Sequence, residues 1–270
     1  MKVMRMHILF IGYGKTSARV AKQLFEQGHQ ISTISQSTKM DSFASHQIQD
    51  VHHLDLLQHQ PIDWVYILLS PKQSTLEAYQ QTYLDSVKPI RCALALHPIQ
   101  RIIVVSSTRV YGENAGEIID DETAVRPNDA QGEILYAMEQ AYLKAYSEKC
   151  TIIRPSGIYG SSVTRLKKMA SEVKHYPNLH WSNRIHIDDL SNFLAYMIHV
   201  EHPEKSYIVT NNDPKPLHKI VQWFQQQMDF PLAVLETEKV TGKKLYATRM
   251  QKLGFELKHV ACFKDYLELI

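Results

Sequence analysis

Short apolar runs alternate with segments that carry apolar residues at helical spacing over the first part of the chain. The run MHILFIGYG at residues 6–14 ends in glycines, residues 15–29 have helical spacing and end beside Gly28, and QISTIS follows at 30–35. This order predicts a strand, a helix and a second strand within about 30 residues. Such a βαβ unit is typical of a parallel sheet with right-handed crossovers.

The same alternation continues to residue 156 and then changes. Up to that point we expect further strands at 50–54, 63–70, 101–107 and 150–156, and helices at 74–97 and 131–148. Buried strands separated by helices predict an α/β fold, a Rossmann-type doubly wound parallel sheet. Shorter elements follow, with helices expected at 163–175, 188–200 and 216–228, a strand at 206–210 and a C-terminal helix. We therefore expect a dinucleotide-binding domain at 1–156 and a smaller C-terminal substrate lobe at 157–270, packed on it.

Composition narrows the class of protein. Apolar residues make up 44% and charged residues 21%, and the formal net charge of +2 provides no broad field for nucleic acid or an anionic membrane. The apolar runs are far shorter than the roughly 20 residues of a transmembrane helix. Cys92, Cys150 and Cys262 are too widely spaced for a disulfide framework or a CxxC zinc site, which predicts reduced core residues of a cytoplasmic protein. The histidines form no HxxxH or HExxH pattern, so no metal site is expected.

A glycine loop lies between the first expected strand and the first expected helix. Gly12 would allow a tight turn there, and Gly14 would let the backbone approach a pyrophosphate at the helix N-terminus. Ser17 replaces the third glycine of the usual fingerprint and is small enough for close helix–strand packing. The alternative is a glycine turn in an α/β protein without a cofactor. We expect dinucleotide contacts from Gly12, Tyr13, Gly14, Lys15, Thr16 and Ser17.

The end of the second strand bears on the choice between NAD and NADP. Ser35, Gln36 and Ser37 follow there, and no carboxylate occurs before Asp41. A carboxylate at this point would bind the ribose 2′-hydroxyl of NAD, whereas hydroxyls and Lys39 suit a 2′-phosphate. This segment predicts NADP, with NAD as the alternative, unless the loop contacts no ligand.

Five later segments carry a resemblance that covers essentially the whole chain. They are RIIVVSSTRVYG (101–112), CTIIRPSGIYG (150–160), NRIHIDDLSNFL (183–194), SYIVTNNDPKPLHKIVQWF (206–224) and RMQKLGFE (249–256). In their order and spacing the chain resembles the extended short-chain dehydrogenase/reductases of the NAD-dependent epimerase/dehydratase family. The resemblance implies an NAD(P)-dependent oxidoreductase or epimerase acting on a nucleotide sugar or a similar polar carbonyl or alcohol. It also implies a homodimer through the helices that follow the fourth and fifth strands.

The resemblance assigns roles to individual residues. Ser107 would hydrogen-bond the reacting oxygen, while Arg184 and His186 would bind a substrate phosphate or carboxylate. The alternative for His186 and Asp188 is that they cap and orient the helix at 188–200. The remaining expected contacts are Leu69, Ser70 and Ser106 beside the cofactor, Pro155 and Ser156 near the nicotinamide, and Arg154 at the substrate.

The family's proton-transfer pair is missing. A tyrosine is expected four residues after Pro127 and a lysine four residues later, because the lysine's charge lowers the phenol pKa from about 10. Gln131 and Leu135 occupy these positions, and no tyrosine of the chain has lysine at the fourth position after it. Tyr111 is the next candidate phenol. The departure resembles an atypical subgroup that includes the bacterial YeeZ-type proteins, and it leaves a non-catalytic NAD(P)-binding sensor as the alternative function.

Overall fold

The computed structural model describes residues 5–270, which form two compact units. The first unit extends to Val110 and includes Pro127–Arg154 and Ser191–Tyr207, and the second contains Tyr111–Arg126, Pro155–Leu190 and Ile208–Ile270. One of these breaks lies close to the division expected at residue 156. The segments 111–126 and 191–207, however, belong to the opposite unit from the one expected.

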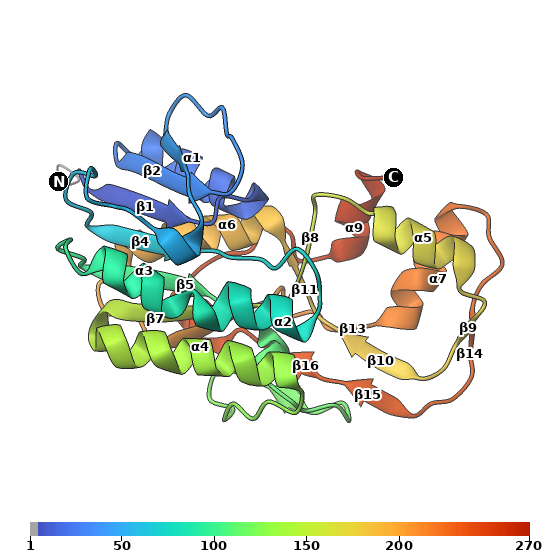
Figure 1. The fold of residues 1–270 in the computed structure, drawn as a ribbon. Helices are drawn as coiled ribbons and strands as arrows, with labels where there is room; N and C mark the ends of the chain where they lie inside the picture. The colour runs from blue at the N-terminus through green and yellow to red at the C-terminus, as the bar shows by residue number, and fades with distance from the viewer. Residues whose placement is uncertain (1–4) are drawn as a thin grey trace. The chain divides into compact units, whose positions relative to one another are not determined.

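The centre of the first unit is a seven-stranded sheet with the order β12-β7-β5-β4-β1-β2-β3 (Figure 1). The neighbouring pairs from β7 to β3 are all parallel. This confirms the expected Rossmann-type sheet. Its strands are β1 (His7–Ile11), β2 (Gln30–Ser35), β3 (Ser45–Ile48), β4 (Trp64–Ile67), β5 (Arg101–Val105), β7 (Cys150–Pro155) and β12 (Ser206–Val209).

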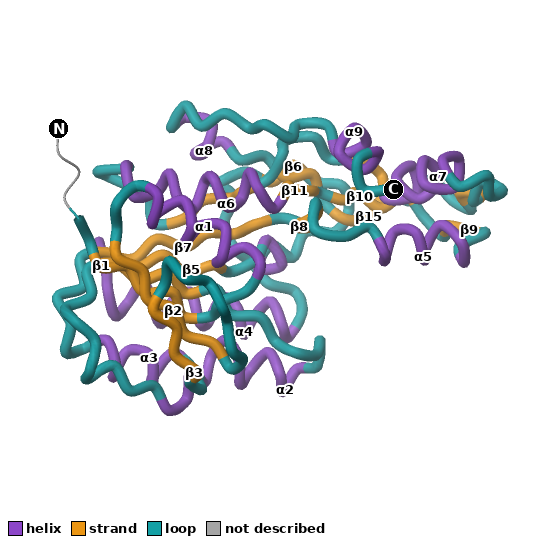
Figure 2. Tube along the Cα trace, turned by 90° about the horizontal axis from the view of Figure 1, so that it is seen from above, coloured by secondary structure: helices purple, strands orange, loops and turns teal. Residues whose placement is uncertain are grey.

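Helices cover both faces of this sheet (Figure 2). On one face lie α1 (Lys15–Glu26) and α6 (Ile187–Tyr196), and on the other α2 (Leu76–Tyr79), α3 (Val87–Leu94) and α4 (Ala130–Tyr146). Because neither face of the central strands meets water, their sequences are almost continuously apolar, and all five residues of β1 are buried. The hydroxyl of Tyr66 in β4 donates to the carbonyl oxygen of Leu194 in α6 at 3.0 Å, which joins the sheet to that helix.

Two expected elements are wrong. The strand expected at 50–54 is instead β3, a few residues earlier. Val51–His53 form a single 3₁₀ turn, and the Asp50 side chain caps it by accepting from the His52 N–H. The helix expected at 74–97 is divided into α2, a π-helical segment η2 (Gln80–Asp85) and α3. Pro89 has no N–H to donate to the carbonyl of Asp85, which accounts for irregular backbone at this point. The other expected elements are present with ends that differ by a few residues.

The second unit is built from short strands and helices. A three-stranded sheet has the order β13-β10-β15, and β11-β8, β14-β9 and β16-β6 form separate pairs. Helices α5 (Thr164–Glu172) and α7 (Leu217–Gln227) share an apolar core with α9 (Cys262–Leu267). The remaining elements are β6 (Ile118–Ile119), β8 (Gly157–Tyr159), β9 (His175–Tyr176), β10 (Leu179–Ser182), β11 (Arg184–His186), β13 (Lys215–Pro216), β14 (Val234–Leu235), β15 (Val240–Gly242), β16 (Lys244–Leu245) and α8 (Thr248–Lys252).

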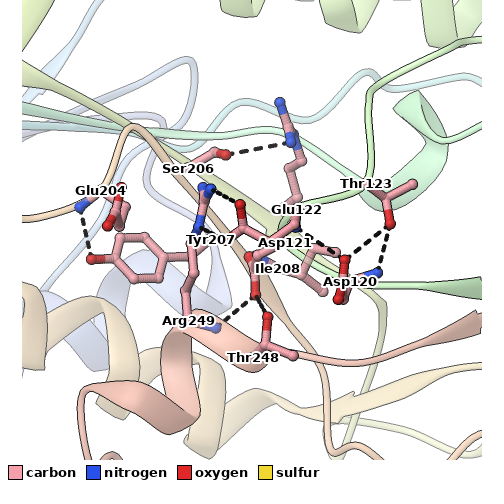
Figure 3. Close-up of polar contacts among 11 residues, drawn as sticks. Asp120, Asp121, Glu122, Thr123, Glu204, Ser206, Tyr207, Ile208, Thr248 and Arg249 are labelled. Carbon is pink, nitrogen blue, oxygen red and sulfur yellow. Dashed lines mark hydrogen bonds and ion pairs between the residues drawn. The ribbon is translucent and has the colours of Figure 1, made fainter.

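A buried carboxylate explains why residues 111–126 belong to the second unit. The side chain of Asp121 accepts hydrogen bonds from the backbone N–H groups of Ile208 and Arg249, at 2.6 and 2.8 Å, and from the hydroxyl of Thr248 (Figure 3). Burial raises the pKa of Asp121, and these donors oppose that shift. Glu122, the next residue, pairs with the Arg249 guanidinium at 3.2 Å. Asp121 thus fixes three segments that are far apart in sequence.

Two expectations from composition can be compared with the described residues. None of the helices between residues 5 and 270 is long and apolar enough to span a membrane. All three cysteines are free thiols, and Cys150 and Cys262 are buried as expected. Cys92 is exposed, so the expectation of a core position is wrong for that residue.

Candidate functional site

A cavity of about 450 Å³ opens in the first unit where β1, β2 and β4 end. Parallel strands place their carboxyl ends at one edge of the sheet, which is where open α/β sheets bind ligands. Most of the lining residues follow one of these strands or the edge strand β3. Seven residues expected at a cofactor reach this cavity: Gly12, Tyr13, Gly14, Ser35, Gln36, Leu69 and Ser70.

The two glycines of the loop have different physical roles. Gly12 has φ of +89°, and a Cβ there would lie 2.2 Å from the carbonyl oxygen of Leu68, so this turn requires glycine. Its N–H donates to the Ile34 carbonyl at 3.0 Å, which ties the turn to β2. Gly14 is extended, and a Cβ there would meet no described atom within 4 Å. Gly14 therefore leaves open space beside the cavity that no packing contact uses.

Helix α1 begins next to this open space. No side chain caps its N-terminus and no acidic residue lies in its first turn, so the positive end of the helix is not neutralised there. The buried hydroxyl of Ser17 donates to the Gly12 carbonyl at 2.8 Å and holds the turn. Lys15, Thr16 and Ser17 are not among the residues that line the cavity. The cavity thus meets α1 at its N-terminus, next to Gly14.

Asp50 also lines the cavity, and the sequence interpretation missed it. Its carboxylate accepts from the Gln36 amide at 3.0 Å and from the His52 N–H at 2.9 Å, and this backbone donor lowers the pKa of Asp50. It was overlooked because a strand was expected at 50–54, whereas the chain turns there. Ser37, which was expected, does not line the cavity, and its carbonyl accepts from the Ser35 hydroxyl.

The serines after β5 lie apart from the cavity lining. The N–H of Ser106 donates to the Ile153 carbonyl at 2.7 Å, and its buried hydroxyl has no hydrogen-bond partner among residues 5–270. The hydroxyl of Ser107 accepts from the Arg109 N–H at 3.2 Å. Ser106 therefore retains a hydroxyl that a ligand could engage, and Ser107 is half-buried at the turn that follows.

Gln131 and Leu135, at the positions where the resemblance expects a tyrosine and a lysine, contribute to the structure of the first unit. The Gln131 amide donates to the Ser74 carbonyl at 2.7 Å, while Leu135 is 1% exposed in the core. Asp129 caps α4 by accepting from the Gly132 N–H at 2.8 Å. Helix α4 thus holds the loop after β4 and fills the core beneath it.

Arg154 is not available for a substrate. Its Nη2 lies 2.6 Å from an oxygen of Glu139, and the two side chains are only 7% and 0% exposed. The Nε of Arg154 also donates to Glu139, at 3.1 Å. The expectation that Arg154 binds substrate is therefore corrected: its guanidinium neutralises a carboxylate buried in α4.

The other expected residues lie around the second unit. Pro155 and Ser156 are buried, and the Ser156 hydroxyl donates to the Thr210 hydroxyl at 3.0 Å. Tyr111 is 1% exposed, which gives no support to a role as proton donor. Arg184 has a buried Nε without a partner among the described residues. His186 is buried and stacks on His259 with ring centroids 3.6 Å apart.

The structure also bears on the alternative that His186 and Asp188 cap and orient α6. The Asp188 N–H donates to Nδ1 of His186 at 3.2 Å, so these two residues do orient each other. The carboxylate of Asp189, in contrast, accepts from the backbone N–H groups of Lys258 and His259 at 3.0 and 2.8 Å. Asp189 thus anchors the segment before α9.

Comparisons with known proteins agree with this geometry. The model of the "NAD dependent epimerase/dehydratase family" matches residues 12–204. A solved structure from Methylobacillus flagellatus, assigned to the NAD-dependent epimerase/dehydratases, is 29% identical with a TM-score of 0.84, and 98% of this chain and 97% of that one are covered. No curated protein matched the sequence.

Two further structures share the fold at lower identity. MoeE5 in complex with UDP-glucose and NAD has a TM-score of 0.80 at 15% identity, with 97% of both chains covered. UDP-glucuronic acid 4-epimerase from Bacillus cereus, in complex with NAD, has a TM-score of 0.79 at 16% identity, covering 98% of this chain and 97% of that one.

Proposed function

Because the chain belongs to the NAD-dependent epimerase/dehydratase family, we propose that its first unit binds a nicotinamide dinucleotide in the cavity beside Gly12 and Gly14. The open space at Gly14, next to an uncapped N-terminus of α1, is the observation that carries this proposal. A pyrophosphate there would accept hydrogen bonds from backbone N–H groups at the positive end of the helix. Two solved relatives with the same fold are NAD complexes.

The choice between NAD and NADP depends on the acid at the cavity. Lys39 and the serines at the end of β2 favour NADP, because a lysine and hydroxyl groups can bind a 2′-phosphate. Asp50 favours NAD, because its ionised carboxylate beside Gln36 repels a 2′-phosphate and can accept from a ribose hydroxyl. The matched test is titration of the wild type and Asp50→Asn with NADH and NADPH. We expect the wild type to prefer NADH and Asp50→Asn to narrow the difference; an NADPH preference in the wild type would contradict this assignment.

For the reaction, we propose oxidoreductase or epimerase chemistry on a nucleotide sugar or a similar polar carbonyl or alcohol. The bound cofactor would supply hydride transfer. In this proposal the Ser107 hydroxyl orients the reacting oxygen, and the Arg184 guanidinium binds an anionic group of the substrate. Water takes the proton that the family's tyrosine would handle. The expected rate is low, since loss of a general acid typically costs about 10²- to 10⁴-fold.

A non-catalytic dinucleotide sensor, of the atypical YeeZ-like kind, is the second candidate. It is favoured by Gln131 and Leu135, which serve a loop contact and the core instead of proton transfer. In this case the protein would bind the dinucleotide to sense it and would catalyse no reaction.

One experiment tests both candidates. Purified chain is titrated with NADH and NADPH by quenching of intrinsic fluorescence, and the loaded protein is screened for cofactor oxidation with UDP- and dTDP-sugars and simple carbonyls. Binding with turnover supports the enzyme, and binding without turnover supports the sensor. Failure to bind either nucleotide would overturn both.

We further propose a cytoplasmic homodimer formed through α2 and α4. A shallow groove between these helices contains Leu76, which is 45% exposed, together with Leu84, Ala130, Ile134 and Ala137, and Glu77, Gln80 and Glu133 also line it. Burying such an apolar surface against a second copy would be favourable. Sedimentation of the wild type and Leu76→Lys checks this: we expect a dimer that the charged variant dissociates, and a monomeric wild type would contradict it.

A further inference from the structure

Two histidine rings lie face to face in the second unit. His186 at the end of β11 and His259 in the segment before α9 have ring centroids 3.6 Å apart and an interplanar angle of 19°. Tertiary packing alone brings them together, so no spacing along the chain reveals the pair. We propose that this histidine pair is a pH-sensitive contact, which holds the C-terminal segment 257–270 at neutral pH and lets it open in acid.

His259 connects the C-terminal segment to the rest of the second unit. The carboxylate of Asp189 accepts from the backbone N–H groups of Lys258 and His259, at 3.0 and 2.8 Å. The Nδ1 of His259 lies 2.8 Å from Asp265 in α9, whose other oxygen accepts the Tyr159 hydroxyl at 2.5 Å. An ionised carboxylate only accepts hydrogen bonds, so Nδ1 of His259 carries a proton. This ring can therefore gain a further proton only at Nε2.

His186 is held in its neutral form. Its Nδ1 accepts from the Asp188 N–H at 3.2 Å, so a proton on Nδ1 would break this bond. The ring lies against Gly160, where a Cβ would be 2.1 Å from Nε2, and the side chain is only 8% exposed. Its other ring neighbour is Tyr159, with centroids 5.1 Å apart. Burial raises the pKa of Tyr159, so this phenol is uncharged.

The charges around the pair oppose a proton on both rings. Burial, and then the charge of His259, lower the pKa of His186. The carboxylates of Asp188, Asp265 and Asp189 favour the charged form of His186 but do not outweigh these two effects. Two imidazolium rings at a centroid distance of 3.6 Å would repel each other strongly, because little water lies between them to screen the charges. The stacked arrangement is therefore stable with at most one charge.

The direction of the pH effect follows from the lowered pKa. While the segment is closed, His186 holds a proton less tightly than an exposed histidine, whose pKa is about 6.5. The contact is therefore complete above about pH 6.5, and proton uptake favours the open form as the pH falls below that value. For one proton, the opening equilibrium changes by at most about tenfold per pH unit.

The test measures the exposure of Cys262 as a function of pH. This thiol is buried in α9, within the apolar core shared with α5 and α7, so it reacts only when the segment opens. In a Cys92→Ser chain the other thiol is Cys150, buried in β7 of the first unit, which reports unfolding of that unit. Labelling by a dipyridyl disulfide, which reacts with thiols in mild acid, is followed by mass spectrometry. An unstructured cysteine peptide corrects for the pH dependence of the reagent.

We expect the corrected labelling rate of Cys262 to rise by up to about tenfold per pH unit below about pH 6.5, while Cys150 stays protected. A Cys262 rate that is independent of pH would overturn the proposal. Labelling of Cys150 in step with Cys262 would also overturn it, because it would show unfolding of the whole chain. The measurement needs no dinucleotide, so its outcome is independent of the proposed function.

Two variants separate the histidine pair from other titrating groups. His186→Gln removes the group with the lowered pKa, and the Cys262 rate should become nearly independent of pH. His259→Gln removes the second charge, so labelling should be faster at neutral pH and should depend less on pH. The matched control is His175→Gln, which removes an exposed histidine of β9 and should keep the wild-type profile. An unchanged pH profile in either variant of the pair would overturn the proposal.

Discussion

Replacing Gly14 by alanine should weaken dinucleotide binding by orders of magnitude while leaving the fold almost intact. Gly14 is extended and a Cβ there meets no described atom within 4 Å, so alanine introduces no clash. Alanine is a poorer helix N-cap than glycine, which should lower the free energy of unfolding by about 1 kcal/mol. That corresponds to a fall in melting temperature of about 2–4 °C for a chain of this size.

The cost to binding is much larger. The added methyl group occupies the space in which a pyrophosphate would approach α1, and charge-assisted hydrogen bonds contribute about 1.5–3 kcal/mol each. Loss of two such bonds weakens binding by about 3–6 kcal/mol, or about 10²- to 10⁴-fold.

Fluorescence titration with NADH, together with thermal denaturation, measures both quantities. Gln27→Ala, at the exposed opposite end of the same helix, is the control and should bind normally. Gly12→Ala should lose stability as well as binding, because φ is +89° and the Cβ would lie 2.2 Å from the Leu68 carbonyl. If Gly14→Ala binds NADH within a few-fold of the wild type, the ligand does not occupy the glycine loop and the reasoning fails.

Three further predictions concern stability and the helix α4. Arg154→Met leaves the Glu139 carboxylate buried without its partner and should lower the free energy of unfolding, measured by urea denaturation, by about 3–5 kcal/mol. A loss below about 1 kcal/mol would show that the ion pair is not needed for stability. Gln131→Ala should leave dinucleotide affinity largely unchanged, since its amide serves the Ser74 carbonyl, whereas a large loss in titration would place α4 at the cofactor. Burial, and then the charge of His199, lower the pKa of His29, so the stability that neutral His29 gives the folded state should be lost as pH falls below about 6.5. His29→Gln should therefore flatten the dependence of melting temperature on pH between 7 and 5. An unchanged slope would contradict this.

The sheet could be predicted from sequence because its strands are buried on both faces. After their first residues, His7 and Arg101, β1 and β5 are apolar throughout, and each precedes a segment with helical spacing. Boundaries that depend on single hydrogen bonds could not be predicted. The turn at Val51–His53 forms because Asp50 caps it, and a polar residue before a short apolar segment fits a strand end equally well.

The candidate site was predictable where backbone geometry requires a residue type. Gly12 is needed by a positive φ and a close backbone contact, and both follow from the strand–turn–helix pattern. Asp50 is different, because tertiary packing alone brings it to the cavity and to Gln36. Arg154 was misassigned for the same reason: an arginine at the end of a strand has the same sequence signature whether it faces a ligand or Glu139.

The packing of α4 limits how the missing chemistry could be engineered into this chain. A tyrosine at 131 would give up the bond that holds Ser74, and a lysine at 135 would lie where Leu135 is 1% exposed. A buried lysine tends to lose its proton, and a neutral amine does not lower the pKa of a phenol. The two substitutions would therefore restore the tyrosine and lysine of the motif without the lysine charge that lowers the pKa of the phenol. A gain of function would require redesign of the core under the helix before the pair itself is introduced.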